Sequence, residues 1–158
     1  MSSINIINEL NNSLFENFIN NLTNEPNPKV LYHFTKSETA YSILKTNTLK
    51  GMDNFQVSFT SDVSYYGNGF QPEERTRCMF AFDADKLSKD YTIERYVYNK
   101  DDTAKFNDYV NEHEWIIKNQ VNNISKYLLY ISSVKDKMNQ EDLDRIKKDF
   151  PNVKIDKW

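Results

Sequence analysis

The chain has 158 residues, the length of one domain, and 39% of them are hydrophobic, with aromatic residues making up 14%. Three glycines and one cysteine exclude a glycine-rich dinucleotide fingerprint, a P-loop and an internal disulfide, and only two histidines accompany that cysteine, so no metal site is expected. The net charge of −3 argues against an extended nucleic-acid surface, and the absence of a long apolar run or a signal-peptide pattern predicts a cytoplasmic protein without a membrane partner.

The first 28 residues are predicted to form an N-terminal helix and a linker. Apolar residues recur at three- and four-residue steps from Ile4 to Leu22, with asparagine and glutamate between them. Pro26 and Pro28 end this pattern. We expect an amphipathic helix whose apolar face packs on the single domain that follows, residues 29–158.

The rest of the chain alternates predicted strands with short helices. Runs of β-branched and aromatic residues predict strands at residues 29–35, 55–60, 77–82, 91–98, 112–118 and 127–132. Short helices are predicted from the N-caps Ser37 and Asn139 and at residues 101–110, and residues 153–158 form a final strand or a loose tail. Central strands with short helices between them predict an α+β domain with a largely antiparallel sheet.

Three of these strands carry two polar residues at positions i and i+2, which places both side chains on one face of a strand. The pairs are His33 with Thr35, Ser58 with Thr60, and Glu112 with Glu114. Each pair alone has an ordinary explanation: a hydrogen-bonded core histidine, the solvent face of an edge strand, and a turn with its acids in water. The three pairs in this order are more specific than any one of them.

The order His-x-Thr, Ser-x-Thr, Glu-x-Glu resembles the ADP-ribosyltransferase-like family, in its bacterial and phage-borne forms, over residues 30–131. The stretches that carry the resemblance are residues 31–35, 57–62 and 112–117, followed by a strand at 124–128. The resemblance implies a split β-sandwich of mainly antiparallel strands. It also implies NAD as co-substrate, bound in a cleft without a glycine-rich loop and without a metal.

The resemblance also implies roles for individual residues. Glu114 would hold the nicotinamide-ribose hydroxyl and stabilise the positive charge that develops as nicotinamide leaves. Glu112 would orient or deprotonate the acceptor. The other expected NAD contacts are His33 and Thr35 at the adenosine-side ribose, Ser58 and Thr60 at the nicotinamide pocket, Tyr65, Tyr66 and Phe70 against the nicotinamide ring, and Arg77 or Arg75 at the pyrophosphate.

The implied function is mono-ADP-ribosylation of a macromolecule by a bacterial or phage effector, with a host protein side chain as the first expected acceptor and nucleic acid as the second. Two alternatives share the fold. A non-catalytic binding module would tolerate loss of Glu114. An NAD-dependent RNA 2′-phosphotransferase-like enzyme would need several basic residues for its RNA, and the net charge argues against it. A phosphoesterase with two His-x-Thr motifs does not fit, because His113 is followed by Glu and Trp.

Overall fold

A computed structural model of the chain describes residues 26–51, 56–63, 77–96 and 114–157, together with positions 5, 6, 9, 10, 12–14, 16 and 17. Its centre is a seven-stranded sheet in the order β5-β6-β3-β1-β4-β8-β9. The strands are β1 (Val30–Thr35), β3 (Gln56–Thr60), β4 (Cys78–Asp83), β5 (Glu94–Arg95), β6 (Glu114–Lys118), β8 (Leu128–Ser133) and β9 (Ile155–Lys157). Neighbouring strands are antiparallel except β8 and β9, which are parallel.

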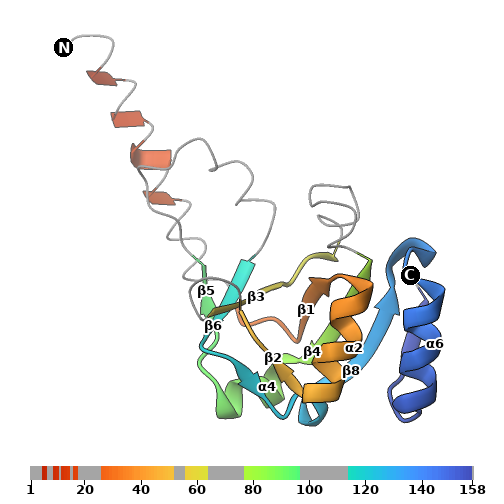
Figure 1. Ribbon diagram of the computed structural model, residues 1–158. Helices are drawn as coiled ribbons and strands as arrows, with labels where there is room; N and C mark the ends of the chain where they lie inside the picture. The colour runs from red at the N-terminus through yellow and green to blue at the C-terminus, as the bar shows by residue number, and fades with distance from the viewer. Residues whose placement is uncertain are drawn as a thin grey trace.

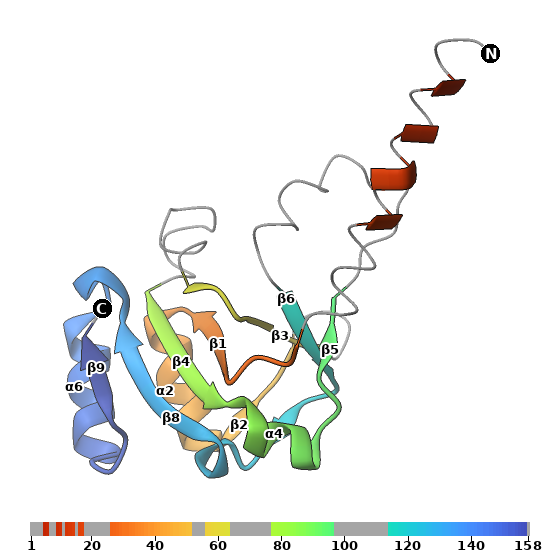
Figure 2. The ribbon, with the colours of Figure 1, turned by 180° about the vertical axis from the view of Figure 1, so that it is seen from behind.

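Short helices and a small second sheet complete the domain. The helices are α2 (Ser37–Thr46), α4 (Ala84–Asp90) and α6 (Gln140–Asp149), with 3-10 turns η3 (Ile124–Lys126) and η4 (Val134–Asp136). Two further strands, β2 (Thr48–Leu49) and β7 (Val121–Asn122), pair with each other. Figure 1 shows α2 lying in front of the large sheet, and Figure 2 shows β5 and β6 at the opposite side of the domain from β9 and α6.

The core lies on the inner face of the sheet. Alternate residues of the strands point to this face, and most are fully buried: Leu31, Val57, Phe59, Phe80, Phe82, Trp115, Ile117 and Ile131. Ala40 and Ile43 of α2, Leu87 of α4 and Ile146 of α6 belong to the same cluster. The aromatic residues thus supply much of the core, which explains how a chain of moderate hydrophobic content folds.

The observed elements confirm most of the predicted ones and correct several details. The N-cap of α2 is Lys36, not Ser37, whose hydroxyl instead accepts a hydrogen bond from the N–H of Asn139 at 3.0 Å. Asn139 does cap α6, because its side chain accepts from the second and third N–H groups of that helix. The strand predicted at residues 124–128 is wrong: this stretch begins as η3, and β8 starts at Leu128. The helix predicted at residues 101–110 lies outside the described residues.

The described positions between 5 and 17 are helical, as the sequence predicts. Their large apolar side chains are exposed, at 54% for Ile6, 62% for Leu10 and 57% for Leu14. Of the apolar face predicted to pack on the domain, Leu14 is described and is exposed, and its other residues lie outside the described residues, so the packing of that face stays a prediction. Figure 1 shows the described segment, in red, apart from the sheet. Among the described residues, none belongs to a helix long and apolar enough to cross a membrane.

Candidate active site

The large sheet is divided between β1 and β3. β1 pairs with β4 along its whole length, from Val30 opposite Asp83 to Thr35 opposite Cys78. Among the described residues of β1 and β3, the pairing is one bridge, Tyr32 opposite Thr60. Among the described residues, one group of strands, β5-β6-β3, is therefore joined to the other, β1-β4-β8-β9, by a single bridge of backbone pairing. Of the residues predicted for the site, His33, Ser58, Thr60 and Glu114 lie next to this junction.

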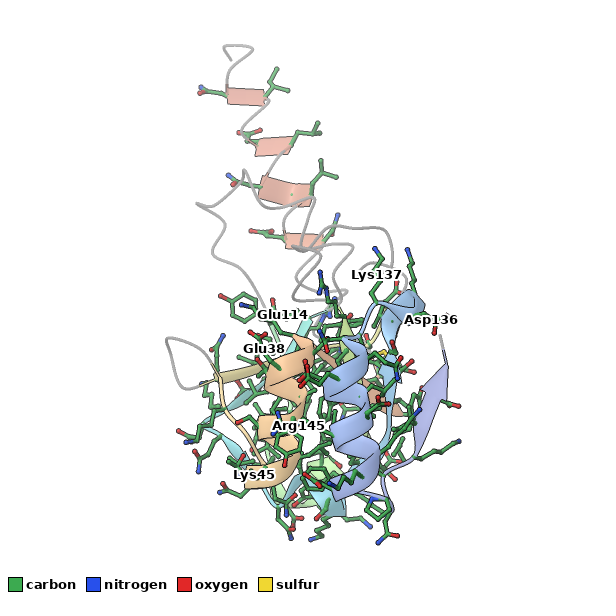
Figure 3. The ribbon with its side chains drawn as sticks, turned by 45° about the vertical axis from the view of Figure 1, so that its right-hand side comes forward. Glu38, Lys45, Glu114, Asp136, Lys137 and Arg145 are labelled. Carbon is green, nitrogen blue, oxygen red and sulfur yellow. The ribbon has the colours of Figure 1, made fainter. Side chains whose placement is uncertain are left out.

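Ser58 and Glu114 meet on the outer face of the β3–β6 pair. Thr60 lies opposite Glu114 in the register, so Ser58, two residues before Thr60, points to the same side as Glu114. The Ser58 hydroxyl donates to Oε1 of Glu114 at 2.6 Å. This distance lies at the short end of the range for a hydrogen bond from a hydroxyl. The contact fixes one oxygen of Glu114, which Figure 3 shows where β6 begins.

His33 reaches the same strand from the other side of the junction. Strict alternation along β1 places its side chain on the opposite face from Tyr32, and its ring packs edge-on against Phe59, with centroids 6.0 Å apart. Its Nδ1 lies 2.9 Å from the backbone carbonyl oxygen of Ser58. The imidazole thus bonds to the backbone of β3 just beyond the bridge between the two strands, from the inner face on which Phe59 lies, whereas the side chains of Ser58 and Glu114 meet on the outer face.

The partner of His33 determines its tautomer. A carbonyl oxygen only accepts hydrogen bonds, so Nδ1 must carry the hydrogen. In the neutral ring Nε2 is then an acceptor, available to a hydroxyl donor. Burial of the ring lowers the pKa of His33 below its usual value, although the bond to the Ser58 carbonyl acts in the opposite direction. His33 is therefore a neutral hydrogen-bonding group near pH 7.

This lowered pKa predicts a pH-dependent stability. The unfolded chain takes up a proton on His33 around pH 6.5, whereas the folded protein resists protonation until a lower pH. The stabilising contribution is thus complete above pH 6.5 and is lost as the pH falls from there toward the folded-state pKa. Urea unfolding at pH 7.5 and pH 5.0 should show a larger loss of stability for the wild type than for His33→Gln. Equal losses of stability for the wild type and His33→Gln would contradict the protonation behaviour assigned to His33.

The structure describes three of the other residues that were predicted to contact NAD. Thr60 is buried, and its hydroxyl bonds to the backbone of Asp62, donating to the carbonyl at 3.1 Å and accepting from the N–H at 3.0 Å. Thr35 is buried opposite Cys78. Arg77 directly precedes β4, and its buried Nε has no hydrogen-bond partner in the part of the chain that the structure describes. Glu112, Tyr65, Tyr66, Phe70 and Arg75 lie outside the described residues.

One residue near Glu114 is not singled out by anything in the sequence. Arg95 lies opposite Trp115 in the β5–β6 pair and donates from Nη1 to the backbone carbonyl of Glu114 at 3.0 Å. β5 has only two residues, too few for a hydrophobic alternation to reveal their orientation. Among the described residues, no three His, Cys, Asp or Glu side chains lie close enough together to hold a metal ion.

Comparisons with known proteins support the fold but not a family assignment by sequence. No protein-family profile and no curated protein matches the chain. A solved structure of DarT from Thermus sp. 2.9, in complex with carba-NAD+, superposes with a TM-score of 0.54 over 84% of this chain and 95% of that one, at 12% sequence identity. The large, mostly antiparallel sheet with its short helices is thus an ADP-ribosyltransferase-like fold.

Proposed function

We propose that this protein is an NAD-dependent mono-ADP-ribosyltransferase. It would cleave the bond between nicotinamide and ribose in NAD and transfer ADP-ribose to a macromolecular acceptor. The observation that carries the proposal is the contact of Ser58 with Glu114 beside the junction of β1 and β3, in a fold shared with DarT. The carba-NAD+ complex of DarT supports NAD as the co-substrate here.

Glu114 is the proposed catalytic residue. As nicotinamide leaves, positive charge develops on the ribose, and a fixed carboxylate stabilises that charge more strongly in the transition state than in the bound substrate. The Ser58 hydroxyl donates to one carboxylate oxygen at 2.6 Å and so fixes the orientation of the side chain that would face the ribose. Nicotinamide is a neutral leaving group, so the reaction needs no strong general acid.

His33 and Arg77 are the proposed NAD-binding residues on the other side of the junction. Nε2 of the neutral His33 ring would accept a hydrogen bond from a ribose hydroxyl on the adenosine side. The guanidinium of Arg77 would bind the pyrophosphate, a role that its buried, unpartnered Nε among the described residues supports. Thr35 and Thr60 would support the two strands, and Tyr65 and Tyr66 would cover the nicotinamide.

The acceptor belongs to the same proposal. Glu112 would orient or deprotonate the acceptor group, two residues before Glu114. A protein side chain in a host cytoplasm is the first candidate, because the net charge of −3 offers little general attraction for nucleic acid. The direct experiment is to incubate the protein and a bacterial lysate with NAD labelled in its adenine, and to separate protein from nucleic-acid products. Label on nucleic acid alone would exclude the protein acceptor.

NAD binding can be tested without any acceptor. A ligand that binds only the folded state raises its stability by about 1.4 kcal/mol at ten times its Kd, which corresponds to roughly 3–6 °C in Tm for a domain of this size. We expect such a shift in the wild type, and a much smaller shift for His33→Ala, because the ribose contact is lost.

Lys45→Ala is the control for this measurement, because Lys45 is exposed in the last turn of α2. Its shift with NAD should equal that of the wild type. A wild-type melting curve unchanged by millimolar NAD would contradict the proposed function and favour a binding module for another ligand.

A further inference from the structure

We propose that Arg95 is a positioning residue for the carboxylate of Glu114, an inference that rests on the proposed transferase function. Arg95 would not touch NAD. It would act by holding the first residue of β6 in the place where its carboxylate meets Ser58.

The guanidinium of Arg95 contacts the start of β6 in two ways. Nη1 donates to the backbone carbonyl oxygen of Glu114 at 3.0 Å, across 19 positions of the chain. The guanidinium carbon lies 5.4 Å from the centre of the Trp115 indole, a cation–π distance. The backbone N–H of Tyr96 donates to the same Glu114 carbonyl at 3.1 Å. The carbonyl of the proposed catalytic residue thus accepts two hydrogen bonds from β5 and its next residue.

Trp115 extends this arrangement to β3. The indole is buried, and its Nε1 donates to the hydroxyl of Ser61 at 3.1 Å. Ser61 directly follows β3, the strand that carries Ser58. Arg95, Trp115 and Ser61 therefore connect β5, β6 and the end of β3 on the inner face, while Ser58 and Glu114 meet on the outer face of the same two strands.

The position of Glu114 in its strand explains why such support matters. Glu114 lies opposite Thr60 in the β3–β6 pair, and its carboxylate reaches the hydroxyl of Ser58, two residues away along β3. Rotation of its peptide would swing the carboxylate away from the Ser58 hydroxyl, now at 2.6 Å. A displacement of about 1 Å in a catalytic group can cost on the order of 100-fold in rate. Two donors on one carbonyl oppose that rotation.

The test is Arg95→Met, which keeps an unbranched stem over Trp115 and removes every donor. We expect kcat for nicotinamide release to fall by about 10- to 100-fold. KM for NAD should change by less than about threefold, since the interaction lost acts mainly in the transition state. Arg95→Lys keeps a cation that can donate to the Glu114 carbonyl, and its kcat should lie between those of Arg95→Met and the wild type.

Lys118→Gln is the matched control. Lys118 also links β6 to β5, through an exposed ion pair with Glu94 at 3.6 Å, but at the end of β6 far from Glu114. An exposed pair of this kind contributes little, so kcat should stay within about twofold of the wild type. The inference is overturned if Arg95→Met loses no more kcat than Lys118→Gln, if Arg95→Lys is no better than Arg95→Met, or if KM rises as steeply as kcat falls.

A second readout separates this inference from the proposed function. Hydrogen exchange at the backbone amide of Trp115 should be faster in Arg95→Met than in both the wild type and Lys118→Gln. If the wild type releases no nicotinamide from NAD, the proposed function fails, yet faster exchange would still show that Arg95 holds this end of β6. Unchanged exchange would overturn the positioning role in either case.

Discussion

Glu114→Gln should lower the rate of nicotinamide release from NAD by about 100- to 1000-fold, the usual cost of losing one electrostatic group in an active site. Glutamine keeps the shape of the side chain and can still accept a hydrogen bond from Ser58. It lacks the negative charge that would face the developing positive charge on the ribose. The rate is measured as nicotinamide released with NAD at saturation, with and without a bacterial lysate.

The NAD-induced rise in Tm should largely persist in Glu114→Gln, because the ground-state contact with a ribose hydroxyl does not require a full charge. A fall in kcat with little change in binding identifies an interaction made mainly in the transition state. Glu141→Gln removes an equivalent charge from the exposed first turn of α6 and should leave the rate unchanged. Nicotinamide release at the wild-type rate in Glu114→Gln would rule out the mechanism.

The strands that carry the candidate site could be predicted because their residues alternate. In β3, Val57 and Phe59 are buried while Ser58 between them is exposed, and this period of two is visible in the sequence. The same alternation indicates that Ser58 and Thr60 share a face. The alternation alone does not predict the contact between Ser58 and Glu114, because that contact requires β3 and β6 to be neighbours. The resemblance to a known family is what placed Ser58 and Glu114 in one site.

Features that depend on strand partners could not be read from the sequence. The alternation of apolar and polar residues indicates which side of a strand is buried, but it does not indicate which strand is its neighbour in the sheet. The single bridge of Tyr32 to Thr60 and the parallel pairing of β8 with β9 are of this kind. The bond from His33 to the Ser58 carbonyl also depends on that separation of β1 from β3.

The start of α2 near Ser37 shows a second limit of prediction from the sequence. A serine just before an apolar pattern has the chemistry of an N-cap, and this predicted Ser37 as the cap of α2. In the structure the hydroxyl bonds to the N–H of Asn139, at the start of α6. A contact between residues 102 positions apart competes with the local one. Local preference was the correct guide at Asn139, whose side chain accepts from its own helix.

Phe82→Ala should lower the free energy of unfolding by about 3–5 kcal/mol, the usual cost of removing a fully buried phenylalanine ring. Phe82 of β4 packs edge-on against Phe59 of β3, with centroids 5.8 Å apart, and stacks beside Phe80 at 6.1 Å. Domains are stable by only about 5–15 kcal/mol, so this change removes a large part of the total. Urea unfolding followed by far-UV circular dichroism measures it.

The Phe82 ring is important to the site as well as to stability, because it extends from β4 to Phe59 of β3 and so joins the two groups of strands through the core. The single bridge of Tyr32 to Thr60 holds β1 and β3 together through the backbone, and the contact of Phe82 with Phe59 holds them through the core. Leu129→Ala on β8 is the control: its side chain is 41% exposed, and the change should cost no more than about 0.5 kcal/mol. If Phe82→Ala were as mild as Leu129→Ala, the aromatic core would not be what keeps Ser58 and His33 on adjoining strands.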